Sequence, residues 1–304
     1  MAEARAPNDP IPIGEAVAPA FVRLPDPQNL FLDRAERFRT LAVAHDLAPY
    51  LRFLGELCAI QARIQPDLPD PSWPSQEEKE RAQEFGMPPL DRNRFAPDAA
   101  ADTTLARLIA SLRQGAMPEA SVAALARVAA AGVGARHDMF RNLLADAIPV
   151  EALAEHALIA AALQVHFARL ATSLDPKRMN PAGDGACPAC GGPPVASLIV
   201  GWQGAHGTRY CACALCGTLW NYVRIKCTLC GSTKGIAYHG VEGDAGTVKA
   251  ETCESCRGYV KIMYQHKEPA LDPVADDVAT LGLDLLVQEA GFRRGAFNPF
   301  LLGY

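Results

Sequence analysis

Apolar residues recur at helical spacing through the first half of the chain. Four of them, typical of an amphipathic helix, follow at intervals of three or four positions: Phe31, Ala35, Phe38 and Leu41. Five further segments show the same spacing, over residues 49–64, 104–114, 118–132, 135–147 and 149–174. The last segment is apolar on most of its surface, so we expect it at the centre of a helical bundle. Residues 66–97 contain seven prolines and are predicted to form a long loop.

The pattern changes after Gly183, where alanine-rich sequence gives way to Cys, Gly, Thr and Tyr. Six short segments there predict strands, over residues 195–201, 209–214, 218–225, 234–239, 247–251 and 258–264. A final helix is predicted to begin at Asp272-Pro273, an N-cap and N1 pair, and to end at Gly291. The aromatic side chains of Phe297 and Phe300 are expected to hold the tail to the surface.

Cysteine is the strongest chemical signal, because nine of the ten cysteines lie between Cys187 and Cys256. Eight of them form Cys-x-x-Cys motifs: Cys187/Cys190, Cys213/Cys216, Cys227/Cys230 and Cys253/Cys256. The spacing C-x2-C-x22-C-x2-C occurs twice, 40 residues apart, so the region contains two copies of one unit. Two cysteines three positions apart can hold a metal in a tight turn, and glycine after the second cysteine permits the positive φ that this turn needs. Two such turns complete a tetrahedral four-thiolate site, as in zinc ribbons and rubredoxins.

We therefore predict that these eight cysteines bind two metal ions. The equal gaps favour sequential pairing, with the first four cysteines at one site, while an interleaved pairing stays open. Four sulfur ligands do not separate zinc from iron, and most such sites are structural. Cys211 shares a predicted strand face with Cys213 and could lie near the metal, although a small buried residue is the commoner role. Cys58 belongs to an apolar helical stripe.

These patterns together predict a multi-domain α+β protein. Its N-terminal part is all-α, and two tandem rubredoxin-like or zinc-ribbon modules and a C-terminal helix follow it. The predicted boundaries are an extended Pro-rich arm (1–27), a helical domain (28–180), a first four-cysteine module (181–226), a second four-cysteine module (227–266), and the C-terminal helix and tail (267–304).

Charge and composition narrow the function. A net charge of -5 lacks the basic excess of a nucleic-acid-binding protein, so no nucleic-acid partner is expected. No uncharged apolar run approaches 18 residues, which argues against membrane insertion. The N-terminal sequence has no signal-peptide pattern, so we expect a cytoplasmic protein, in which clustered cysteines more often bind metal than form disulfides. No spacing assembles a nucleophile, a base and an oxyanion hole, so no catalytic residues are assigned and an enzyme is not expected.

Three stretches of sequence resemble the FdhE family of formate dehydrogenase accessory proteins. The first is NLFLDRA at residues 29–35, followed by Leu47-Ala48-Pro49-Tyr50-Leu51. The second is the run LCGTLWNYVRIKC at 215–227, which links the two cysteine units. The third runs from Arg293-Arg294-Gly295 to Asn298-Pro299-Phe300. The resemblance spans roughly residues 20–304 and includes all four Cys-x-x-Cys motifs.

This resemblance implies a cytoplasmic assembly factor for respiratory formate dehydrogenases, which binds the catalytic subunit before export. It also implies rubredoxin-like modules in which the eight cysteines bind iron, with zinc as the alternative metal. Two other functions stay open: an iron redox or thiol-exchange protein and, less favoured, a nucleic-acid-binding zinc ribbon. The sequence does not fix the oligomeric state, and a homodimer stays open.

Overall fold

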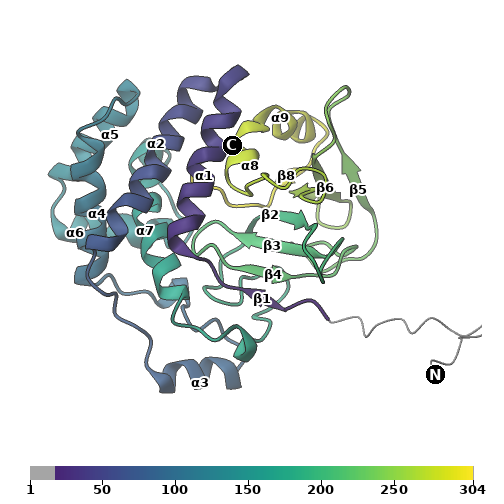
Figure 1. Cartoon of the computed structure of the whole chain (residues 1–304), viewed down its shortest axis with the longest axis horizontal. Coiled ribbons are helices and arrows are strands. Elements are labelled where there is room, and N and C mark those ends of the chain that lie inside the picture. The colour runs from purple at the N-terminus through teal and green to yellow at the C-terminus, as the bar shows by residue number, and fades with distance from the viewer. Residues whose placement is uncertain (1–17, 304) are drawn as a thin grey trace, which may run out of the picture.

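A computed structural model describes residues 18–303, so most of the predicted arm (1–27) lies outside the described residues. The helices of the N-terminal half are α1 (Pro27–Leu41), α2 (Ala48–Ile64), α3 (Gln76–Glu84), α4 (Ala99–Leu112), α5 (Glu119–Ala130), α6 (Val133–Leu144) and α7 (Leu153–Ala171). Short 3-10 turns lie at Ala42–Ala44, Gln65–Asp67, Arg92–Arg94, Val150–Ala152 and Pro176–Arg178. Figure 1 shows these helices gathered on one side of the molecule and the sheet on the other.

Helix α7 forms the centre of the helical domain, as its nearly continuous apolar surface predicts. Fifteen of its 19 residues are buried, and α2, α4, α5 and α6 pack around it. Its start differs from the predicted one, because a 3-10 turn separates Pro149 from Leu153. Among residues 18–303, no helix is long and apolar enough to cross a membrane.

The predicted loop 66–97 contains helix α3, so the loop prediction was wrong for Gln76–Glu84. A capping box starts this helix: the Ser75 hydroxyl accepts from the Glu78 N–H, and the Glu78 carboxylate accepts from the Ser75 N–H. Ala82 is its one buried residue, so α3 shows no apolar stripe. Helix α4 also begins earlier than the predicted segment 104–114, because the Asp98 carboxylate accepts from the Ala101 N–H and caps the helix there.

In the part of the chain that the structure describes, seven strands of the C-terminal half and one N-terminal strand form a single sheet. They are β1 (Val22–Arg23), β2 (Pro194–Ile199), β3 (Arg209–Cys213), β4 (Leu219–Asn221), β5 (Ile236–His239), β6 (Val248–Cys253), β7 (Gly258–Met263) and β8 (Arg293–Arg294). The order is β1-β4-β3-β2-β7-β6-β5, and β8 pairs with β7. All six predicted strand segments are present, with shifted ends.

The two cysteine units form one continuous sheet. Strands β2, β3 and β4 recur 40 positions later as β5, β6 and β7, and β2 pairs with β7 in parallel, with Ala196 opposite Lys261. An ion pair between Arg209 and Glu251 (2.8 Å) also joins them, and both of its side chains are almost fully buried. The sequence repeat therefore corresponds to a structural repeat whose two copies share a hydrogen-bonded edge.

The predicted C-terminal helix is split at Thr280 into α8 (Ala275–Ala279) and α9 (Leu281–Glu289). The helix begins later than the predicted Asp272-Pro273 pair, with Val274 as its N-cap residue, although the Asp272 carboxylate accepts from the N–H groups of Val274 and Ala275 at its start. The buried Lys261 ammonium of β7 donates to the carbonyl oxygens of Asp277 and Thr280, which holds α8 and α9 against the sheet.

The tail is held to the helical domain as expected. Phe300 is buried, its ring meets the ring of Phe38 edge to face, and its carbonyl oxygen accepts from the Tyr50 hydroxyl. The other end of the described chain is also part of the fold, because β1 pairs with β4.

Candidate metal centres

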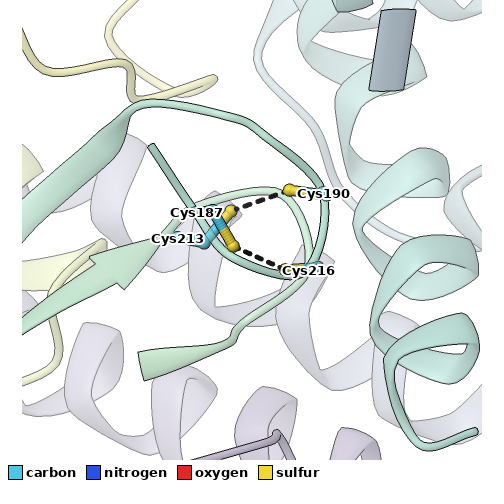
Figure 2. Close-up of side chains that lie close together, drawn as sticks. All are labelled: Cys187, Cys190, Cys213 and Cys216. Atoms are coloured by element: carbon cyan, nitrogen blue, oxygen red, sulfur yellow. Dashed lines mark hydrogen bonds between the residues drawn. The ribbon is translucent and has the colours of Figure 1, made fainter. Parts of the chain in front are cut away.

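The eight repeat cysteines gather into two groups of four, which we call cluster 1 and cluster 2. Within each group, the sulfur atoms all lie within 4.8 Å of one another. Cluster 1 contains Cys187, Cys190, Cys213 and Cys216, and Figure 2 shows these side chains converging from two turns of the chain. Cluster 2 contains Cys227, Cys230, Cys253 and Cys256. The grouping is the sequential one, and the interleaved arrangement is not seen.

Each cluster is built by two tight turns with the same backbone hydrogen bonds. In cluster 1 the N–H groups of Gly191 and Gly217 donate to the carbonyl oxygens of Cys187 and Cys213, at 2.8 and 3.1 Å. The equivalent bonds of cluster 2 run from Gly231 to Cys227 (3.0 Å) and from Arg257 to Cys253 (2.8 Å). The repeat in sequence is thus a repeat in backbone geometry.

Positive φ angles follow three of the turns, as the glycines predict. Gly191, Gly217 and Gly231 have φ angles of +76°, +73° and +71°. The fourth turn has Arg257 in the same region, with φ of +55°, where a side chain is disfavoured by roughly 1–2 kcal/mol. Its guanidinium lies 4.0 Å from the centre of the Phe292 ring and donates to the Ala290 carbonyl oxygen (3.1 Å), which helps to offset that cost.

The sulfur spacing fits a tetrahedral metal site. Pairs of sulfurs are separated by 3.4 and 3.6 Å in cluster 1 and by 3.7 and 3.8 Å in cluster 2. A disulfide bond would bring two sulfurs to about 2.0 Å. Four sulfurs at about 2.3 Å from one zinc ion would lie about 3.8 Å apart. The four-thiolate donor sets therefore fit zinc or iron, and all eight cysteines are free of disulfide bonds.

Crowding of the four thiols favours one thiolate in each cluster. Burial raises the pKa of the Cys187 thiol, whereas hydrogen bonds from its three neighbours hold the pKa of Cys213 well below its usual range. In cluster 2, burial raises the pKa of Cys227 to about 12. Burial also opposes ionisation of Cys253, but hydrogen bonds from the N–H groups of Cys256 and Ser255 bring its pKa to about 7. A cation would lower the pKa of the remaining thiols, so metal binding releases protons.

Cluster 1 lies in the interior, and part of its cover comes from the loop between α3 and α4. The Leu90 N–H donates to the Ala189 carbonyl oxygen (2.8 Å), and the Arg92 N–H donates to the Cys190 carbonyl oxygen (3.0 Å). These bonds join the loop to the first cysteine turn over a separation of about a hundred residues in sequence. All four cysteines of cluster 1 are buried.

Helices α7 and α1 cover the second turn of cluster 1. The buried Gln164 side chain of α7 donates to the Ala214 carbonyl oxygen at 2.8 Å. On α1, Leu30 lies so close to Gly217 that an added Cβ would come within 2.6 Å of its methyl carbon. The helical domain is therefore part of the wall of this site.

Cluster 2 has a thinner cover, made by the C-terminal tail. The Leu229 side chain fits between Gly258 and Gly295, where an added Cβ at either glycine would overlap its methyl carbons. Cys227 and Cys253 are buried, but Cys230 and Cys256 are exposed. Two of the four possible ligands thus face solvent.

The two remaining cysteines lie outside both clusters. Cys211 is buried on β3 with its sulfur 3.7 Å from the Ser197 hydroxyl, and burial raises its pKa to about 11. Cys58 is buried in α2, where desolvation raises its pKa to about 12. Both have the environment of small buried residues. No local spacing links Leu90 or Gln164 to the cysteines, so the partners of cluster 1 in the helical domain are not visible in the sequence.

Models of one family match nearly the whole described chain. The N-terminal FdhE model covers residues 19–184, the central-domain model covers 186–224, and the C-terminal-domain model covers 225–301. The chain belongs to the FdhE family. It is 46% identical over 298 residues to the FdhE homolog of Rhizobium meliloti, covering 97% of each chain. The FdhE homolog of Proteus mirabilis is 36% identical, with 92% of this chain and 90% of that protein covered.

A solved structure of the family agrees with the fold. The crystal structure of the FdhE protein from Pseudomonas aeruginosa superposes with a TM-score of 0.83 at 33% identity. The match covers 94% of this chain and 99% of that one. The resemblance found in the sequence is thereby confirmed, together with the fold class of a helical N-terminal region, two four-cysteine units and C-terminal helices.

Proposed function

We propose that this FdhE-type accessory protein is a cytoplasmic assembly factor for a respiratory formate dehydrogenase. It binds the catalytic subunit before export and catalyses no reaction of its own. The observation that carries the proposal is the pair of four-cysteine clusters in a chain of this family. The proposed ligands are Cys187, Cys190, Cys213 and Cys216 for one ion, and Cys227, Cys230, Cys253 and Cys256 for the other.

In this proposal the metal ions make the sheet a rigid docking surface. Each ion would be held by one turn before the first strand and one turn after the second strand of a hairpin, which lie side by side at its open end, so binding fixes the two strands between them. We propose iron as the resident metal, with zinc as the alternative, because the donor set accepts both. The boundaries at residues 180, 226 and 266 are likewise proposed. The arm 1–27 includes β1, so its last residues belong to the sheet.

The test replaces two ligands of cluster 1 and follows the partner enzyme. A variant with Cys187→Ser and Cys190→Ser is expected to lose one metal ion and to leave formate dehydrogenase inactive in cells. Cys211→Ser is the matched control, because it removes a buried thiol outside both clusters. A pull-down with the purified catalytic subunit reports binding directly. Normal enzyme activity in the double variant would contradict the proposal.

A second candidate, a redox or thiol-exchange protein, is favoured by the exposure of Cys230 and Cys256. An iron ion held by four thiolates exchanges one electron, which gives the purified protein a red, reducible spectrum. Colourless protein that holds two equivalents of zinc would exclude the redox function but would not contradict the docking function.

A further inference from the structure

Among residues 18–303, strand β5 is paired on one side only, with β6, and its other side is an open edge of the sheet. β5 is the last strand in the order, and Figure 1 shows it at the side of the molecule away from the helical domain. The Glu254 N–H donates to the Gly235 carbonyl oxygen, so these two residues form a hydrogen-bonded pair of the antiparallel ladder between β5 and β6. Hydrogen-bonded pairs recur at every second residue, so the backbone groups of Ala237 bond to β6, while those of Tyr238 point outward. Such an edge is a ready template for one more strand.

Exposed apolar side chains lie around the same edge. Tyr238 is 38% exposed, and Val241 in the following turn is 44% exposed. On the same face, Tyr238 lies opposite Glu251, whose carboxylate accepts a hydrogen bond from Arg209. The Arg209 side chain also donates to carbonyl oxygens of the linker between the two cysteine units. Val223 and Ile225 of this linker are each 61% exposed. These side chains make the region around β5 apolar as well as open.

A basic cluster borders this region, although the whole chain has a net charge of -5. Tyr264 is at its centre, with the ammonium nitrogens of Lys249 and Lys267 at 6.0 and 5.2 Å from its ring centre. The His266 ring lies 5.7 Å from the Tyr264 ring. Within residues 18–303, neither lysine has a carboxylate oxygen closer than 4.0 Å. The Lys249 stem lies against Gly240, so the basic cluster adjoins the end of β5.

We propose that an extended acidic segment of the formate dehydrogenase catalytic subunit binds along β5 as an added strand. This inference rests on the proposed function and assigns a surface to it. The outward backbone groups of β5 would pair with the segment, and the apolar residues would contact its alternate side chains. Lys249 and Lys267 would face its carboxylates and set its direction and its rate of association.

The observations favour this occupant over two others. If β5 paired with β5 of a second copy of the chain, two identical basic clusters would lie next to the same pair of strands, and their like charges would repel. A nucleic acid has no peptide N–H and C=O groups to pair with the outward backbone groups of Tyr238, so it would leave the open strand edge unused. A peptide with carboxylates can pair its backbone with β5 and place its carboxylates at the basic cluster.

The first experiment compares Tyr238→Pro with Tyr238→Ala in the full-length, metal-loaded protein. Both variants lose the phenol and its contact with Glu251, but proline also removes the outward N–H. Proline at an edge position whose N–H faces solvent keeps the ladder to β6. We expect the proline variant to bind the purified catalytic subunit about tenfold more weakly than the alanine variant, which corresponds to one lost hydrogen bond. Circular dichroism and metal content confirm that both variants fold.

The second experiment compares Lys267→Glu with Lys177→Glu. Both replacements change the net charge by the same amount at exposed positions, but Lys177 lies beyond α7 in the helical domain. Lys267→Glu is expected to slow association about three- to tenfold at low salt, with a smaller effect at high salt, whereas Lys177→Glu leaves the rate unchanged.

The outcomes separate this inference from the function on which it rests. Wild-type protein that does not bind the catalytic subunit would overturn both proposals. Wild-type binding with equal affinities for the two Tyr238 variants, or equal rates for the two lysine variants, would overturn the β5 surface and leave the assembly function standing. Salt-dependent retention of RNA that Lys267→Glu abolishes would assign the basic cluster to nucleic acid and would also overturn it.

Discussion

The two four-cysteine clusters have the same spacing in sequence and different surroundings in space. All four cysteines of cluster 1 are buried, whereas two of those in cluster 2 are exposed. The difference does not come from the ligands or from the turns, which share the same backbone hydrogen bonds. It comes from the elements that cover each cluster: helices α1 and α7 and the loop before α4 for cluster 1, and the short C-terminal tail for cluster 2.

This difference implies that the two copies of the unit have different roles in the fold. Cluster 1 joins the helical domain to the sheet, because its turns accept hydrogen bonds from Leu90, Arg92 and Gln164. Cluster 2 is the outer unit, and its own strand β5 forms the open edge of the sheet. We therefore expect cluster 1 to dominate stability and cluster 2 to respond first to solvent, chelators and oxidants.

The largest expected effect is on stability, for Cys190→Ser compared with Cys230→Ser. These residues occupy equivalent positions in the two copies. Loss of a buried ligand should lower the free energy of unfolding by about 3 kcal/mol or more, because the metal site and its hydrogen-bonded cover are lost together. Loss of the exposed ligand should cost about 1 kcal/mol. Urea unfolding of the two metal-loaded variants measures the difference, and equal losses would show that the helical cover does not couple cluster 1 to the fold.

Metal release should follow the same asymmetry. A colorimetric chelator added to the native protein is expected to remove one equivalent at least about tenfold faster than the second, because Cys230 and Cys256 are accessible without opening of the fold. Alkylation of these two cysteines with iodoacetamide in the metal-free protein should precede that of the other eight, all of which are buried. Cys230→Ser should abolish the fast phase and leave the slow one. A single phase of two equivalents would contradict the comparison.

Much of this arrangement follows from local sequence. The equal gaps between the Cys-x-x-Cys motifs correctly indicated sequential grouping, and the glycines after Cys190, Cys216 and Cys230 correctly indicated positive φ angles. The apolar stripe of α7 predicted its central place. In each case, the physical cause acts within a few residues, so the pattern is visible along the chain.

Other features depend on contacts that no local pattern encodes. The parallel pairing of β2 with β7 joins residues more than sixty positions apart, so the sharing of one sheet was not predicted. The burial of cluster 1 depends on Leu90 and Gln164, which are distant in sequence from every cysteine. Helix α3 was missed because its stability derives from a capping box and charged residues rather than from an apolar face.

A smaller effect is expected where the tail covers cluster 2. Gly295→Ala would press a Cβ into the Leu229 side chain and should lower the free energy of unfolding by about 1–3 kcal/mol. It should also speed the fast phase of metal release, because Leu229 lies between two ligands of cluster 2. Gly282→Ala in α9 is the control, since an added Cβ there meets no atom within 4 Å. That change should stabilise the protein by about 0.5–1 kcal/mol. Equal stability of Gly295→Ala and the wild-type protein would show that the contact with Leu229 does not hold the tail over cluster 2.

The smallest effect is expected at the one turn without glycine. Arg257→Gly relieves a positive φ angle, which should gain roughly 1 kcal/mol. It also removes the contact with the Phe292 ring and the hydrogen bond to the Ala290 carbonyl oxygen, whose joint loss is of similar size. The free energy of unfolding should therefore change by less than about 1 kcal/mol, as urea denaturation would show. If Arg257→Gly instead speeds metal release from cluster 2 about tenfold, the Arg257 side chain holds this turn against the tail and slows its opening. Gly217 has no side chain to perform that role at the equivalent turn of cluster 1.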